Sequence, residues 1–323
     1  MTMTVAPHTT RDRIFKALPY IFVLIGAVIM VIPYYWMVIG AFKSLPELQA
    51  VPPRFTIENP TLDNFYNPEW LPDTRTVQEI RGLFQRYTDV PGGFMRYYGN
   101  SLLIAGVNTV LGLLVASLAA YVLAKHRFPG RNFLFVLILG SMMVPWQVTL
   151  IPGYLMVAGR IIALPAIDLN GHVSWMMGNS WIDSYAALII PAIPRAFTLF
   201  FLRQYMLTIP DELVDAARVD GAGELRIWWT IMLPLVIPAM VAMGLFLFLG
   251  EWNNLVWPSV VLQSDHMRTL PLVMAGMVDQ FSPPIDLGMV MAASLLVSIP
   301  TLLLFIAFQK QFVRGIAMTG MKG

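Results

Sequence analysis

The chain has 323 residues, of which 57% are hydrophobic and only 12% are charged, about half the charged share of an ordinary soluble domain. A water-soluble chain of this length needs more charge to cover its surface, so the composition argues against a soluble enzyme. Lys and Arg (21) nearly balance Asp and Glu (19), which leaves no basic excess for binding nucleic acid. With no Cys and only four scattered His, we expect neither a thiolate site nor a bound metal. The class that remains is a polytopic membrane protein.

In chain order, six segments are long and apolar enough to cross a membrane, which takes about 20 residues. They are residues 18–40, 98–124, 133–158, 185–205, 228–250 and 287–308. The apolar run of the first is too long for a cleaved signal peptide. Pro191, Pro194 and Arg195 interrupt the fourth. We expect an all-α fold of six transmembrane helices in one domain, 1–323, because no polar segment is large enough for a core of its own.

The distribution of Lys and Arg predicts the orientation of these spans. If the N-terminus is cytoplasmic, the four inside segments and the adjoining Arg203 hold 12 Lys and Arg residues in about 65 positions. The outside segments then hold eight in about 120 positions. Since cytoplasmic loops of membrane proteins are enriched in basic residues, we expect both termini in the cytoplasm.

The most informative polar segment is 208–234, which reads TIPDELVDAARVDGAGELRIWWTIMLP. Thr208 is placed to cap a helix whose first turn contains Pro210 and Asp211. The helix is expected to end at Gly221, which can adopt the left-handed conformation of a C-terminal cap. The segment therefore predicts about three turns of exposed helix, too short and too polar to span a membrane.

The periodicity of an α-helix places Asp211, Asp215 and Arg218 on one face of this segment. Ala216 and Ala217 leave a slim surface on which another protein could approach the backbone closely. From helix physics alone, the segment is equally consistent with a plain interfacial helix between two spans.

The spacing of residues in this loop resembles the signature of importer-type ABC transporter permeases, E-A-A-x3-G-x9-I-x-L-P. Here it reads Asp215-Ala216-Ala217, Gly221, Ile231 and Leu233-Pro234, with every interval matching. In that family the loop is a coupling helix that docks in a groove of a cytoplasmic ATPase subunit. The residues that the resemblance implies for coupling are Asp215, Ala216, Ala217, Arg218, Asp220, Gly221 and Ala222. The leading acid is Asp rather than Glu, which shortens its reach by one methylene.

Further stretches resemble the sugar-importing branch of the family, on the side of the maltose and glycerol-3-phosphate permeases. They are FKSLPELQAVPPRF, NSLLIAGVNTVLGLLVASLAAYVLAKHRFPGR, VPWQVTLIP, FFLRQYM, WNNLVWP and QKQFVRGIAMTGMKG. Two outside segments, near 68–95 and 160–184, look longer than is usual in the family, and the sequence assigns them no role.

The resemblance implies a type I ABC importer permease in a bacterial or archaeal inner membrane, forming half of a carbohydrate translocation path. The implied partners are membrane lipid, a second permease subunit, two copies of an ABC ATPase and an extracytoplasmic binding protein that delivers the sugar. The chain itself is expected to be non-catalytic and to bind no cofactor, with ATP and Mg on the ATPase.

A small set of polar residues near the spans is a candidate for the solute path: Arg195, Trp252, Asn253 and Asn254. Amides beside indoles suit sugar rings and hydroxyls, although an aromatic belt at the membrane interface explains the same pattern. A cation inside a span is costly in lipid, so Arg195 should face protein or a water-filled cavity. It can contact a polar solute, or pair with an acid of a partner subunit or with carbonyls freed by Pro191 and Pro194.

Other functions stay open at this point. Glycerol 3-phosphate or another polar solute is the alternative within the same transporter class. A self-sufficient secondary transporter is disfavoured, because the spans carry almost no acids for ion coupling and show no inverted repeat. A membrane enzyme is disfavoured by the lack of H-E-x-x-H, G-x-S-x-G and G-x4-G-K-[ST] motifs.

Overall fold

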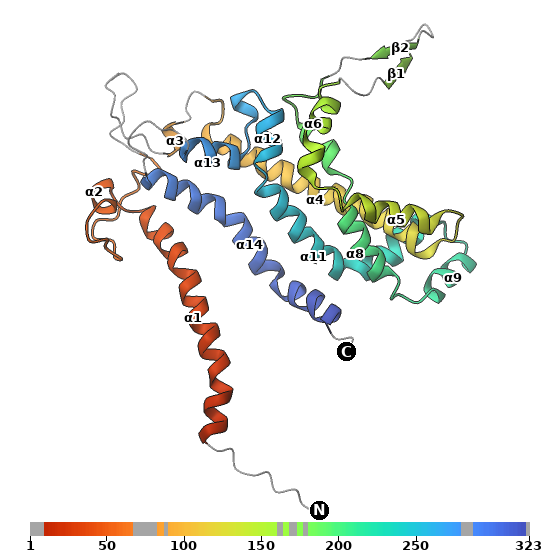
Figure 1. Ribbon diagram of the computed structural model, residues 1–323, viewed down its shortest axis with the longest axis horizontal. Helices are drawn as coiled ribbons and strands as arrows, with labels where there is room; N and C mark the ends of the chain where they lie inside the picture. Colours follow the sequence, from red (N-terminus) through yellow and green to blue (C-terminus); the bar gives the residue numbers. More distant parts are fainter. Residues whose placement is uncertain are drawn as a thin grey trace, which may run out of the picture. The chain divides into compact units, whose positions relative to one another are not determined.

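The computed structural model describes residues 10–66, 83–86, 90–159, 164–167, 173–176, 180–278 and 287–320. Within these ranges the regular structure is helical except for one small hairpin (Figure 1). The α-helices are α1 (Thr10–Gly40), α2 (Leu45–Leu48), α3 (Leu83–Arg86), α4 (Gly93–Lys125), α5 (Arg131–Ser141), α6 (Trp146–Val157), α7 (Tyr185–Ile189), α8 (Ala196–Met206), α9 (Glu212–Val219), α10 (Glu224–Ile227), α11 (Leu233–Trp252), α12 (Val256–Val261), α13 (Leu270–Val278) and α14 (Leu287–Gly320). The 3₁₀-helices η1 (Ile190–Ala192) and η3 (Asp265–Met267) and the π-helix η2 (Trp228–Met232) complete the helical elements.

The structure contains the six expected candidate spans if one bent helix pair is counted as a single span. Five segments are long and apolar enough to cross as they stand: Leu18–Gly40, Gly93–Lys125, Tyr185–Met206, Glu224–Trp252 and Leu287–Gln309. The third expected span, 133–158, is not one straight helix. It consists of α5 and α6, which meet at 99°. Pro145 explains the break, because proline disfavours helical conformation in the residue before it and cannot donate to the preceding turn.

The fourth span is broken where the sequence indicates. α7 gives way to η1 at Pro191, and α8 begins only after Pro194 and Arg195. Arg195 has the non-helical dihedral angles φ −124° and ψ 88°. Two prolines within four residues remove two backbone donors, so the helix cannot run through this point.

The fold is all-α as expected, and one small hairpin lies within the segment 160–184. There, β1 (Leu164–Ile167) pairs antiparallel with β2 (Val173–Met176), with Leu164 opposite Met176 and Ile167 opposite Val173. Of the other long segment, 68–95, the structure describes only α3 and residues 90–95.

The described residues fall into two compact units, one formed by 1–87 with 280–296 and the other by 88–279 with 297–323. In the first unit, the polar stretch after α1 folds back on that helix end. Lys43 is fully buried and its ammonium group donates to the carbonyl of Arg54. The amide of Asn64 donates to the carbonyls of Ala41 (2.9 Å) and Lys43 (2.8 Å). These bonds satisfy backbone groups that the end of α1 leaves without helical partners.

In the second unit, α4 lies alongside α8 and α11 (Figure 1). Small residues of α4, including Ala116 and Ala120, let these helices approach closely, as is usual between membrane helices. The core at this end of α4 is a single cluster: Ala116, Ala120, Tyr121, Ala124, Leu202, Met206, Val214, Ala217, Ile227, Met232, Val236 and Ala239. The segment 208–234 is therefore packed onto the spans rather than suspended from them.

Candidate functional site: the loop 208–234 and a cavity beside Arg195

The short helix predicted in 208–234 is present as α9, but it begins later than the sequence suggests. Thr208 does not cap it, because its hydroxyl turns back to donate to the carbonyl of Tyr205 at 2.8 Å. Asp211 stands at the N-terminal boundary with near-helical dihedral angles and makes no side-chain cap bond. Its carboxylate is engaged elsewhere, with Lys125 at the end of α4.

The C-terminal end of α9 is formed as predicted. Gly221 has φ +77°. Its N–H donates to the carbonyl of Arg218 at 3.0 Å, and the N–H of Ala222 donates to the carbonyl of Ala217 at 2.9 Å. This pair of bonds is the Schellman motif, which turns the chain sharply out of a helix and favours glycine at its left-handed position. The turn fixes the angle between α9 and the next segment, α10.

The two faces of α9 differ in burial. Val214 and Ala217 are buried in the core cluster described above, whereas Ala216 is exposed. Leu213 is 45% exposed and Val219 is 87% exposed, so apolar side chains of α9 remain uncovered outside the core cluster. Of the residues implied for coupling, exposed side chains or backbone belong to Asp215, Ala216, Arg218, Asp220 and Gly221, while Ala222 is half-buried.

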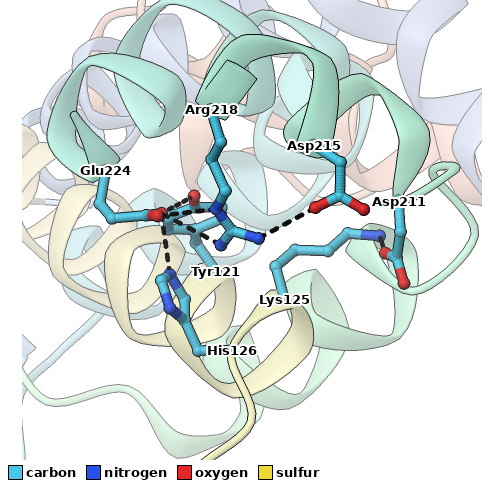
Figure 2. Close-up of polar contacts among 7 residues, drawn as sticks. All are labelled: Tyr121, Lys125, His126, Asp211, Asp215, Arg218 and Glu224. Carbon is cyan, nitrogen blue, oxygen red and sulfur yellow. Dashed lines mark hydrogen bonds and ion pairs between the residues drawn. The ribbon is translucent and has the colours of Figure 1, made fainter. Parts of the chain in front are cut away.

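An ion-pair network attaches α9 to the end of α4 and the start of α10 (Figure 2). Arg218 donates to Asp215 at 3.1 Å and to Glu224 at 2.8 Å. Glu224 also accepts a hydrogen bond from the hydroxyl of Tyr121 and lies 3.0 Å from Nε2 of His126. Three helices thus meet at one carboxylate.

The second contact of the network is between Lys125 and Asp211, at 2.5 Å. The hydrogen bond from Lys125 lowers the pKa of the Asp211 carboxylate below its ordinary value. The hydrogen bond to Glu224 raises the pKa of the Arg218 guanidinium. These charge-assisted hydrogen bonds hold both ends of α9 to the C-terminal end of α4.

A cavity of about 570 Å³, with a mostly apolar lining, lies between residues of the third and fourth candidate spans and the segment 251–257. Its lining residues are Trp146, Thr149, Leu150, Pro152, Gly153, Met156, Leu188, Pro191, Ala192, Arg195, Glu251, Asn254 and Trp257. Two of the elements beside this space are interrupted by proline, since α6 begins directly after Pro145 and η1 contains Pro191. A volume of this size is typical of small-molecule sites.

The four residues expected on a solute path divide into two groups. Arg195 and Asn254 line the cavity. Trp252 does not: it is 1% exposed, stacks on Phe248 and donates from its indole N–H to the carbonyl of Val297 at 3.2 Å. Asn253 lies outside the lining and donates to the carbonyl of Leu249 at 2.9 Å.

The partner of Arg195 is an acid of the same chain. Its guanidinium forms an ion pair with Glu251, whose side chain is 9% exposed. The second carboxylate oxygen of Glu251 accepts from the amide of Asn108 at 2.9 Å. Glu251 was visible in the sequence beside Trp252 and Asn253, but only the packing of α11 against the fourth span shows that it meets Arg195.

A chain with five or six candidate spans and a short anchored helix between two of them is a multi-pass membrane protein. It belongs to the family described as "Binding-protein-dependent transport system inner membrane component", whose match covers residues 109–318. Members of this family are membrane components of multi-subunit transport systems.

Relatives match over almost the whole chain. The arabinooligosaccharides transport system permease protein AraQ of Halalkalibacterium halodurans is 34% identical over 92% of this chain and 93% of its own. The sn-glycerol-3-phosphate transport system permease protein UgpE of Yersinia enterocolitica is 29% identical over 92% and 94%. The fold resembles that of a chain in the crystal structure of a bacterial ABC transporter involved in import of the acidic polysaccharide alginate. That match has a TM-score of 0.74 at 20% identity, over 95% of this chain and 100% of the other.

Proposed function

We propose that this chain is a permease subunit of a carbohydrate importer and that α9 transmits to its spans the work of ATP hydrolysed on another chain. The observation that carries the proposal is the construction of α9. The helix is exposed on one side and fixed on the other by the core cluster, the Lys125–Asp211 contact and the Gly221 turn. An element built in this way can be pushed by a partner without detaching from the second span.

The uncovered apolar side chains of α9 and its neighbour support a protein partner. Leu213, Val219 and Leu225 are 45%, 87% and 68% exposed in a loop otherwise rich in charge. Apolar side chains rimmed by polar residues mark interaction sites. We assign this surface to a cytoplasmic ABC ATPase that binds ATP and Mg, present in two copies, with a second permease subunit contributing the other half of the path.

The remaining parts of the proposal follow from the family and from charge. A binding protein outside the membrane delivers the solute, and both termini of this chain lie in the cytoplasm. A carbohydrate is favoured by the arabinooligosaccharide relative, with glycerol 3-phosphate as the second candidate from the other.

The test is purification and reconstitution of the complex. A tagged chain in mild detergent should bring down an ATPase subunit and a second permease in stoichiometric amounts. Proteoliposomes of that complex should hydrolyse ATP faster when solute-loaded binding protein is present on the side of the membrane opposite the ATPase. Uptake by this chain alone, in liposomes without ATP, would contradict the proposal.

A further inference from the structure

The cavity described above contains one positive and one negative side chain, and they neutralise each other. Among its described lining residues, Arg195 and Glu251 are the ionisable ones, and they form an ion pair. The amide of Asn108, itself 1% exposed, holds the other oxygen of Glu251. The carboxylate is therefore fixed as the partner of Arg195, and the cavity has no net charge.

Several polar atoms around this pair have no hydrogen-bond partner among the described residues. They are Nε of Arg195, Oδ1 of Asn108 and Oγ1 of Thr269, all buried. Thr269 lines a small adjoining space that shares Glu251, Asn254 and Trp257 with the main cavity. Buried polar atoms in native proteins are almost always paired. Of these residues, Arg195 lines the main cavity and Thr269 the adjoining space. A hydroxyl group, which donates and accepts, suits both kinds of atom.

The walls of the cavity are aromatic on two sides. Trp146 is 52% exposed, and Trp257 is fixed by an indole N–H bond to the carbonyl of Ala187 at 2.9 Å. Gly153 lies against the Trp257 ring, where an added Cβ would be 3.4 Å from the nearest ring carbon, an ordinary van der Waals contact. Fixed indole faces pack well against the apolar faces of a ring whose edges carry hydroxyls.

We propose that this cavity is a binding site for an uncharged, hydroxyl-rich solute, and that Glu251 sets this specificity by neutralising Arg195. An anion entering the site would have to displace a buried carboxylate from its guanidinium and then lie beside it. Repulsion between the anion and the Glu251 carboxylate would disfavour binding, and like-charge contacts of this kind exclude wrong ligands from specific sites. The inference rests on the proposed function as an importer and narrows its solute to a neutral sugar, against glycerol 3-phosphate.

The charge of the cavity can be measured with thiol reagents, because the chain contains no cysteine of its own. Thr149→Cys places a thiol on the lining, and Ser180→Cys, exposed outside it, serves as the matched control. The assembled complex is treated with anionic sulfonatoethyl and cationic trimethylammonioethyl methanethiosulfonates. Labelling of this chain is then read by mass, and the anionic-to-cationic rate ratio at Thr149→Cys is divided by the ratio at Ser180→Cys.

The expected ratio is near one in the parent. Glu251→Gln should raise it about tenfold, Arg195→Gln should lower it about tenfold, and the double variant should restore it, since a unit charge within a few Å changes the local potential by that order. Arabinotriose should slow labelling of the parent, whereas glycerol 3-phosphate should slow it only in Glu251→Gln. Any one of three results would overturn the inference. They are a labelling ratio that the single variants leave unchanged, protection of the parent by glycerol 3-phosphate, and no protection of the parent by arabinotriose.

The same complexes separate this inference from the proposed function. Binding-protein-stimulated ATP hydrolysis in the parent, together with unchanged labelling ratios, would overturn the neutral-site inference alone. No stimulated hydrolysis in the parent would overturn the importer proposal itself.

Discussion

The ammonium group of Lys125, in the last turn of α4, lies 2.5 Å from the carboxylate of Asp211, just before α9. The side chain of Lys125 is 3% exposed, while that of Asp211 is 72% exposed. Lys125 also donates to the carbonyl of Ile209. A buried ammonium therefore fixes the start of the loop 208–234 to the end of α4, through contacts between residues more than 80 positions apart in the sequence.

The turn after α9 gives the sharpest test of coupling. Gly221→Val should abolish uptake and binding-protein-stimulated ATP hydrolysis while the chain still inserts in the membrane. No atom lies within 4 Å of an added Cβ, so the whole effect comes from the positive φ, at a cost of about 1–3 kcal/mol. Gly223→Val is the matched control, because Gly223 is equally uncrowded but has φ −72°. Wild-type rates for Gly221→Val in reconstituted complexes would remove α9 from its proposed role.

The leading acid of the loop should matter less. Asp215 is 67% exposed and pairs with Arg218, which keeps Glu224 when Asp215 is removed. An exposed pair of this kind contributes at most about 0.5 kcal/mol. We expect Asp215→Ala to reduce stimulated ATP hydrolysis only partly, and Asp215→Glu, the usual residue in the family, to be tolerated. If Asp215→Ala were as damaging as Gly221→Val, the carboxylate would have a direct contact that this chain alone does not account for.

The Lys125–Asp211 contact predicts a pH dependence. Because the pKa of Asp211 is lowered in the folded state, the contact stabilises the loop above the ordinary carboxyl pKa of about 3.9 and is lost as the pH falls through the lower folded value. Between about pH 5 and 8, Asp211 should therefore cause no change in the amide exchange of α9, once the exchange rates are corrected for their intrinsic dependence on pH. An acid-induced loss of protection should appear in the parent and be smaller in Asp211→Asn, in which the Glu224 carboxylate, whose pKa is lowered by the hydrogen bond from Arg218, still becomes protonated in acid. A step near neutral pH that Asp211→Asn removes would contradict this assignment.

The Arg195–Glu251 pair predicts a non-additive pattern of stability. Removing one member leaves a mostly buried charge without its partner, which typically costs about 3–5 kcal/mol. Arg195→Gln and Glu251→Gln should each lower the thermal midpoint of the detergent-solubilised complex. The double variant should be closer to the parent than either single variant, because two amides can bond to each other. Additive losses would show that the two side chains act independently.

The orientation of the chain can be tested with the same cysteine-free background. An impermeant thiol reagent outside intact cells should label Ser180→Cys and should label Ala216→Cys only after the membrane is permeabilised. Both residues are exposed on this chain. Labelling of Ala216→Cys in intact cells would reverse the predicted topology.

Hydropathy was sufficient to find the candidate spans of the described residues, because length and apolar content are local properties of the sequence. It could not show that α5 and α6 meet at 99°, since a window average records how apolar a segment is and not its direction. Pro145 was the available signal for the break. The hairpin in 160–184 was missed because each strand has only four residues, too few for an alternation of polar and apolar side chains to stand out.

The end of α9 was predictable and its beginning was not. Gly221 has few conformational competitors at a left-handed position, so spacing alone identified it. Thr208 could cap a helix or bond to the preceding turn, and the carbonyl of Tyr205 at the end of α8 decided the outcome. The pairing of Arg195 with Glu251 depends on how two distant helices pack, and no local pattern encodes that.

The bend between α5 and α6 also determines what the surroundings of this chain must provide. A helix supplies its own backbone partners, but the ladder is interrupted where the two helices meet, and hydrocarbon has no groups to replace the missing bonds. Met143 and Trp146 are 84% and 52% exposed at this junction. The junction must therefore lie at the membrane–water interface or be covered by a neighbouring subunit. A single copy of this chain in lipid would have its least well solvated backbone at this bend.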